Sequence, residues 1–125
     1  MTAKAIRQEG DREYLDGLVG LELSAVTFVR DYVQLEFDGP VISAFTPPTV
    51  TTEEGRVSYS QRGYRDALCE RIGASVVSAV VQLKQQLKID LSDGSSLEIS
   101  LRREDREVEE AAVYRDKVTK EWTSW

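Results

Sequence analysis

The feature that most constrains this chain is an alternating segment that ends in Asp-Gly and occurs twice. The first copy, VQLEFDG, covers residues 33–39, and the second, LKIDLSDG, covers residues 87–94. Apolar and polar residues alternate in both, which predicts two β-strands with one buried face each. Asp-Gly supplies the positive φ angles that a tight hairpin turn requires. We therefore expect Asp38 and Asp93 to form turns rather than to bind a ligand or to catalyse a reaction.

These two strands belong to a longer internal similarity. A shift of 53 residues aligns Gly10 with Gly63 and Gly20 with Gly73. A period near 50 residues indicates a tandem duplication of one supersecondary unit, although two unrelated segments with similar turns remain the alternative. The predicted organisation is one domain, 1–125, with unit one at 10–46, a connection at 47–62, unit two at 63–102 and a C-terminal tail at 103–125.

Each unit is predicted to begin with a short helix. Tyr64, Leu68 and Ile72 share one helical face in unit two. Leu15 and Val19 form the corresponding stripe in unit one. A glycine follows each segment, where a helix commonly ends in the left-handed conformation. The first helix is expected to be the weaker one, because a further glycine within it costs about 1 kcal/mol relative to alanine.

After each helix the apolar period changes from 3.6 to 2, which predicts three strands per unit. Polar turns at 30–31 and 84–86 separate the first two strands of each unit, and a small hairpin is predicted around Glu54-Gly55 in the connection. An α-β-β-β unit used twice gives an α+β fold. We expect a mainly antiparallel sheet, or two sheets face to face, covered by two short helices.

The tail at 103–125 belongs to neither unit. Residues 104–114, EDREVEEAAVY, favour a helical turn, whereas extended structure is slightly favoured over helix after Ala112. Two tryptophans near the end need a surface to cover, either the domain's own core or sheet edge, or a subunit or partner interface. The candidate interaction surface consists of Trp122 and Trp125 together with Tyr59 and Arg62.

Charge and cysteine content narrow the classes of partner and the compartment. The net charge of −6 disfavours binding to nucleic acid or to an anionic membrane surface. The first residues, MTAKAIRQEGDREYLDG, lack the apolar core of a signal peptide, and no apolar run approaches the length of a membrane span. One cysteine, Cys69, fits a reducing compartment. The expected location is the cytoplasm.

The residue types present exclude much familiar catalytic chemistry. Without histidine there is no Ser-His-Asp or Cys-His catalysis, and the commonest zinc ligand is missing. Residues 90–98, DLSDGSSLE, resemble a calcium loop, but the register puts Leu101 where a bidentate glutamate belongs. No Gly-rich phosphate loop occurs. We therefore predict no catalytic residue, no cofactor site and no metal site, and a protein that is not an enzyme.

Three segments together carry a resemblance to a known group: LVGLELSAVTF (18–28), VQLEFDG (33–39) and GYRDALCERIG (63–73). The chain resembles a family of small uncharacterised bacterial proteins that share an LVG opening, an Asp-Gly hairpin, a GYRDALC-like helix and a tryptophan near the C-terminus. The resemblance implies an α+β domain of bacterial origin and no established activity. A looser likeness links the chain to small acidic immunity partners of bacterial toxins.

The favoured functional hypothesis is a non-enzymatic protein-interaction domain that binds a protein partner or a second copy of itself. An immunity-like role, with the acidic surface facing a basic toxin, is one form of it. The second hypothesis is a small-molecule binding domain with an apolar groove between the two units. That groove would be lined by Tyr59, Tyr64, Arg62 or Arg65. The third is an enzyme that uses only carboxylates with Tyr, Lys or Arg.

Overall fold

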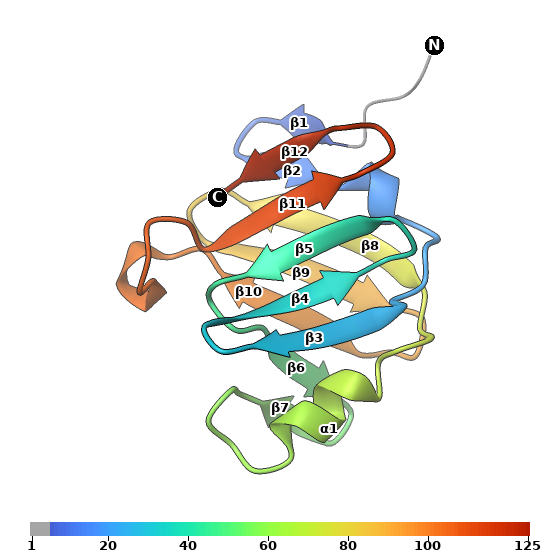
Figure 1. The fold of residues 1–125 in the computed structure, drawn as a ribbon, viewed down its shortest axis with the longest axis vertical. Helices are drawn as coiled ribbons and strands as arrows, with labels where there is room; N and C mark the ends of the chain where they lie inside the picture. The colour runs from blue at the N-terminus through green and yellow to red at the C-terminus, as the bar shows by residue number, and fades with distance from the viewer. Residues whose placement is uncertain (1–5) are drawn as a thin grey trace.

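Two antiparallel sheets lie face to face and make up most of the protein (Figure 1). The computed structural model describes residues 6–125. The first sheet has seven strands in the order β1 (Arg7–Glu9), β2 (Arg12–Tyr14), β8 (Val76–Gln82), β9 (Gln86–Leu91), β10 (Ser96–Ser100), β6 (Thr49–Thr52) and β7 (Gly55–Val57). The second has five, in the order β12 (Trp122–Ser124), β11 (Ala112–Asp116), β5 (Pro40–Ala44), β4 (Tyr32–Glu36) and β3 (Ala25–Val29).

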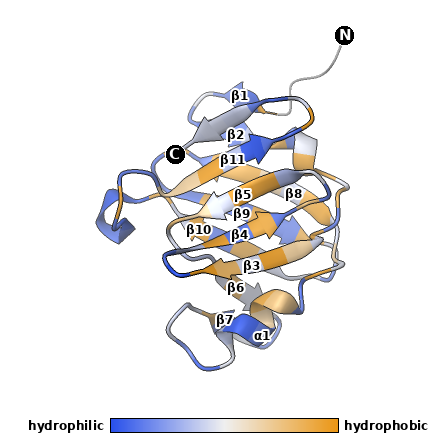
Figure 2. Cartoon of the chain, viewed as in Figure 1, coloured by the Kyte–Doolittle hydropathy of each residue, from blue (hydrophilic) through white to orange (hydrophobic). Residues whose placement is uncertain are grey.

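The core lies between the sheets and is made by the alternating strands. Val33 and Leu35 of β4 face Leu87 and Ile89 of β9 across one continuous buried cluster, and each is at most 2% exposed. The polar residues between them point outward, as a period of two requires. Figure 2 shows this alternation as apolar and polar stretches within single strands. Burial of these two apolar faces against each other is the main force that stabilises the fold.

The α+β prediction is wrong, since the protein is almost entirely β. Within residues 6–125 the only α-helix is α1 (Tyr64–Cys69), and η1 (Asp16–Leu18) and η2 (Arg103–Asp105) are single 3₁₀ turns. A helix of six residues is too short to cover a sheet. The two sheets cover each other instead, so the fold needs no helical layer.

The first predicted helix is instead a hairpin followed by one 3₁₀ turn. Leu15 is buried, but its N–H donates to the carbonyl of Ala79 in β8 at 2.9 Å, as a strand residue would. Leu18 is also buried, whereas Val19, expected on the same helical stripe, is 49% exposed. Gly17 lowers the helical preference of the segment, and pairing with β8 satisfies the backbone at lower cost.

The second predicted helix forms, but it is shorter than the apolar stripe suggested. Tyr64 and Leu68 are buried, whereas Ile72 is 45% exposed and lies beyond the helix end. Gly73 has φ 98° but does not cap the helix, because α1 ends at Cys69 with Glu70 as its right-handed cap and the Gly73 N–H donates to the Leu23 carbonyl at 2.8 Å. The helix lies at the end of the sandwich beside β3 and β6 (Figure 1).

Residues that the 53-residue shift relates meet in the structure. Glu22 and Ser75 form an antiparallel bridge between the segments that precede β3 and β8. Four backbone hydrogen bonds surround the bridge and form two pairs, because a shift of 53 residues at both ends of one bond gives the other bond of its pair. They run from Gly20 N–H to Val76 O, Gly73 N–H to Leu23 O, Leu23 N–H to Ala74 O and Val76 N–H to Leu21 O, at 2.8–2.9 Å. A local twofold axis therefore passes through this bridge.

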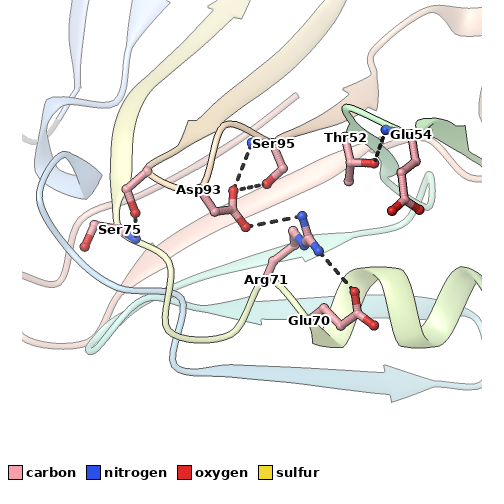
Figure 3. Close-up of polar contacts among 8 residues, drawn as sticks. Thr52, Glu54, Glu70, Arg71, Ser75, Asp93 and Ser95 are labelled. Carbon is pink, nitrogen blue, oxygen red and sulfur yellow. Dashed lines mark hydrogen bonds and ion pairs between the residues drawn. The ribbon is translucent and has the colours of Figure 1, made fainter.

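The second Asp-Gly turn is fastened to the end of α1, as Figure 3 shows. An ion pair of 3.2 Å joins Arg71 to Asp93, and Arg71 also contacts Glu70 at 3.3 Å. Partial burial alone would raise the pKa of Asp93, but hydrogen bonds from the Ser95 hydroxyl and N–H, with the charge of Arg71, lower it below its usual value. Asp93 thus contributes to holding the turn, and Asp38 occupies the first turn at φ 53°.

The last two strands form a hairpin, which extends the five-stranded sheet. β11 pairs with β5 and with β12, so residues 112–116 and 122–124 are extended. Residues 104–114, expected to favour a helical turn, instead run from the 3₁₀ turn η2 through an irregular loop into β11. No helix among residues 6–125 is long and apolar enough to cross a membrane.

Candidate functional site

The four residues predicted as an interaction surface do not lie together. Trp122, 65% exposed, is on β12 at the edge of the five-stranded sheet. Tyr59, 57% exposed, and the exposed Arg62 follow β7, an edge strand of the other sheet. Figure 1 places β12 and β7 at opposite ends of the molecule. Any surface that uses one of these ends is separate from the other.

Trp125 makes internal contacts. Its indole Nε1–H donates to Glu13 Oε1 of β2 at 2.8 Å, and its ring packs against the core cluster. Its backbone N–H donates to Ala112 O at 2.9 Å, and its carbonyl accepts from Ala111. Trp125 therefore joins the end of the five-stranded sheet to β2 of the seven-stranded sheet, and Trp122 is the more exposed of the two tryptophans.

Tyr59 lies on a fixed support. Its ring meets Tyr64 edge to face, with centroids 5.6 Å apart and an interplanar angle of 78°. The Tyr64 hydroxyl donates to the Pro48 carbonyl at 2.5 Å, and burial raises the pKa of Tyr64. Because Tyr64 is held on both sides, Tyr59 is presented to solvent on a rigid platform.

Tyr59 forms one wall of a groove with a volume of about 490 Å³. Among its lining residues, Tyr32 and Phe45 form a tilted ring pair with centroids 5.0 Å apart and an interplanar angle of 43°, and the Arg65 guanidinium lies 5.5 Å from the Phe28 ring centroid. We call this the aromatic groove. Its lining comes from unit one, the connection, α1 and the tail: Phe28, Val29, Arg30, Asp31, Tyr32, Val33, Phe45, Pro47, Thr49, Ser58, Tyr59, Ser60, Arg65, Asp105 and Glu107.

A second hollow of about 610 Å³ continues the groove beyond the Tyr32–Phe45 pair. It shares that pair with the aromatic groove and adds the exposed Val108 and two carboxylates. We define residues 104–110, EDREVEE, as the acidic loop. The full set of residues lining this second hollow is Asp31, Tyr32, Phe45, Glu107, Val108, Glu109 and Glu110. An apolar floor thus meets a rim rich in carboxylates.

Arg106 holds the acidic loop against the sandwich. Its two terminal guanidinium nitrogens donate to the carbonyls of Leu101 at 2.7 Å and Glu109 at 2.8 Å. The Ser100 hydroxyl donates to Asp105 at 2.5 Å at the start of the loop. These hydrogen bonds connect Ser100 to Asp105 and Leu101 to Glu109 through Arg106, so they hold the loop and its carboxylates in one arrangement.

The comparisons with known proteins come to a single result. Neither a protein-family model, nor a curated protein, nor a solved structure matches this chain. The resemblance to a family of small bacterial proteins stays a prediction, as does the looser likeness to immunity proteins. The case for a function is therefore made from the groove itself.

Sequence reasoning passed over most of the residues in this site. The pair Glu109-Glu110 is typical of solvated loop charge, and residues 104–114 favour a helical turn in the sequence. One signal was present in the strands, because Tyr32 and Phe45 occupy outward positions where a solvated strand face usually carries polar residues. Of the predicted groove residues, Tyr59 and Arg65 do line the aromatic groove, whereas Tyr64 supports it from behind.

Among residues 6–125, no group of three or more Cys, Asp or Glu side chains is arranged to hold a metal ion. Cys69 is exposed and free at the end of α1. The groups that line the groove are aromatic rings, carboxylates and two guanidinium groups.

Proposed function

We propose that this protein is a non-enzymatic interaction domain that binds a basic and partly apolar segment of a partner protein. The segment would lie along the aromatic groove and the acidic loop. The observation that carries the proposal is the position of the acidic loop, held by Arg106, beside the Tyr32–Phe45 ring pair. An immunity-like protein facing a basic toxin would fit this description.

Charge supports a cationic partner. The two hollows are lined by five carboxylates and two arginines, which leaves a local excess of three negative charges in a chain of net charge −6. A cleft lined by one sign of charge raises the local concentration and the association rate of an oppositely charged partner. The carboxylates are Asp31, Asp105, Glu107, Glu109 and Glu110, and the arginines are Arg30 and Arg65.

The aromatic floor supports a partner whose cations stand beside apolar side chains. Tyr32 and Phe45 are half-buried and face outward, and Val108 is 53% exposed at the rim. Aromatic faces attract both apolar groups and cations, so arginine or lysine next to leucine or an aromatic residue fits this surface. Interface energy is commonly concentrated in such buried aromatic anchors surrounded by a polar rim.

The test is an NMR titration with a synthetic hexapeptide of alternating arginine and leucine. The matched probe replaces each arginine with glutamate. We expect the basic peptide alone to shift the amide signals of residues 28–33, 45 and 105–110, and we expect added salt to weaken the effect. Equal binding of the acidic peptide, or shifts confined to other surfaces, would refute the proposal.

A paired substitution sharpens the experiment. Glu107→Gln with Glu109→Gln removes two rim charges and should weaken binding about two- to thirtyfold, since an exposed ion pair contributes about 0.2–1 kcal/mol. The control, Glu53→Gln with Glu54→Gln, makes the same change of charge in the exposed β6–β7 turn. This turn follows Thr52 at one end of β6, whereas Thr49 at the other end of β6 lines the aromatic groove. The control should leave binding within about a factor of two.

A small-molecule ligand is the second candidate, because the aromatic groove falls within the range of about 300–1,000 Å³ found for ligand pockets. An aromatic amine such as tryptamine is the probe for this candidate. Tight binding of tryptamine with no binding of the basic peptide would favour the small molecule. The cytoplasm is part of the proposal, because a single exposed free thiol fits a reducing compartment.

A further inference from the structure

A third hollow, the cationic cavity, lies where the acidic loop begins. Its volume is about 740 Å³, and it is bounded by the β8–β9 turn at Lys84 and by residues 101–106. The Leu101 N–H donates to the carbonyl of Gln85 at 3.0 Å, which fixes the two boundaries against each other. The cavity is therefore formed by connected backbone segments rather than by an isolated loop.

The charge of this cavity is opposite to that of the protein as a whole. Lys84, Arg102, Arg103 and Arg106 line it, and Glu104 is the one carboxylate among the lining residues, which gives a local charge of +3. The chain as a whole carries −6. Four of its sixteen lysines and arginines are thus gathered around one hollow.

These cations are not neutralised by the protein. Among residues 6–125, no ion pair within 4.0 Å involves Lys84, Arg102 or Arg103. Arg106 uses its terminal nitrogens on carbonyl oxygens, which carry no net charge, and its buried Nε has no hydrogen-bond partner in the described residues. Positive charges held close together without counter-charges repel one another, and a bound anion reduces this repulsion.

We propose that this cavity is a binding site for a compact phosphate-bearing anion that carries two or more negative charges. Arginine forms paired hydrogen bonds with phosphate oxygens, and lysine adds a mobile point charge. No aromatic ring stands among the residues that line the cavity, so the site offers nothing on which a nucleobase would stack. The cavity therefore recognises the phosphate groups of the ligand rather than a base.

Isothermal titration calorimetry with inorganic phosphate, pyrophosphate and tripolyphosphate tests the site. Affinity should rise in that order, because each added charge meets the same group of cations. Adenosine triphosphate should bind about as tightly as tripolyphosphate, since the base has no partner. No detectable binding of tripolyphosphate at low ionic strength would overturn the proposal. Much tighter binding of a single-stranded oligonucleotide, increasing with its length, would also overturn it and would indicate a nucleic-acid surface instead.

Substitutions separate this site from general attraction between charges. Arg102→Gln with Arg103→Gln should weaken binding of tripolyphosphate by about tenfold or more. The matched control, Arg62→Gln with Lys117→Gln, removes two exposed positive charges elsewhere and should change the affinity by less than about twofold. An equal loss in both variants would refute a localised site.

The Glu107→Gln with Glu109→Gln variant distinguishes peptide binding at the aromatic groove from phosphate binding at the cavity. It removes negative charge from the aromatic groove and leaves the cavity cations in place, so phosphate binding should persist. Loss of peptide binding with retained phosphate binding would support both sites. Phosphate binding that disappears in this variant would contradict the assignment to Lys84, Arg102 and Arg103.

Discussion

Two buried tyrosines of this protein differ in the hydrogen bonding of their hydroxyl groups, which makes a pair of substitutions informative. The Tyr64 hydroxyl donates to the Pro48 carbonyl at 2.5 Å. The Tyr114 hydroxyl is buried but has no hydrogen-bond partner among residues 6–125. A buried polar group without a partner costs about 1–3 kcal/mol, and removing the group removes the cost. Tyr114→Phe should therefore stabilise the protein, whereas Tyr64→Phe should destabilise it.

We expect Tyr114→Phe to raise the free energy of unfolding by about 1 kcal/mol, because the ring keeps its packing and only the hydroxyl is lost. Tyr64→Phe should lower the free energy of unfolding by about 1–3 kcal/mol, since it leaves the buried Pro48 carbonyl without its donor. For a chain of this length, 1 kcal/mol corresponds to roughly 4 °C in Tm. Urea unfolding at pH 7, followed by tryptophan fluorescence, measures both variants.

Alkaline pH provides a second measurement of the same hydroxyl. Burial, with smaller contributions from the charges of Asp116 and Glu121, raises the pKa of Tyr114 to about 12. Between pH 10 and pH 12 the unfolded chain releases this proton while the folded chain retains it, so the folded protein loses stability as pH rises. Tyr114→Phe removes this loss, and its advantage over the parent protein should grow across that window. The pKa of Tyr64, also raised, affects both proteins equally and cancels in the comparison.

The reasoning fails if Tyr114→Phe is less stable than the parent protein at pH 7 while Tyr64→Phe shows its expected loss. That result would mean that the Tyr114 hydroxyl has a partner that contributes to stability. A stability difference between Tyr114→Phe and the parent that stays constant from pH 9 to pH 12 would separately contradict the retained proton.

Three further substitutions test the contacts described above. Trp125→Phe should lower the free energy of unfolding by about 1 kcal/mol in urea titrations, because it removes the indole hydrogen bond to Glu13 that joins the sheets. Asp93→Asn should destabilise the protein at pH 7 and flatten its loss of stability in acid. The reason is that the lowered pKa gives stability at neutral pH that is lost as pH falls through the folded-state value; urea midpoints from pH 7 to pH 2 measure it. Arg106→Gln should speed amide hydrogen exchange of residues 102–110 alone, since it releases the acidic loop.

The strands were predictable because their information is local. Alternation predicted that Val33 and Leu35 lie on one face, and the Asp-Gly and Arg30-Asp31 turns predicted where the hairpins end. In the structure β4 pairs with β3 across the Arg30-Asp31 turn, with Val29 opposite Tyr32. The α+β fold class was wrong in part because Leu15 and Val19 have spacing compatible with a helix. Leu15 in fact follows a hairpin that pairs with β8, some 65 residues away in the chain, and Val19 is exposed. Tertiary pairing of this kind overrides helix propensity and leaves no mark on the local pattern.

The candidate site was less predictable, and the reason is also physical. A groove forms where side chains from separate segments converge, and Tyr59, Phe45 and Glu107 come from three segments whose proximity depends on the crossing of the chain between sheets. Residue type could show that the tail is acidic, but not that Arg106 folds it back beside the ring pair. The same limit applied to Trp122 and Trp125, which are neighbours in sequence but differ in exposure and contacts.

The net charge of the chain does not indicate how unevenly its charges are distributed over the surface. A total of −6 argues against anionic ligands when charge is treated as uniform, yet residues 101–110 separate a hollow of local charge +3 from a groove with a local excess of −3. Arg106 connects the two, since its guanidinium contributes to the cationic cavity and also holds the Glu109 carbonyl on the acidic side. Charges of opposite sign so close together would attract and collapse onto one another if the segment were mobile. The hydrogen bonds from Arg106 to Leu101 and Glu109 oppose that collapse, so the two surfaces of opposite charge stay separate.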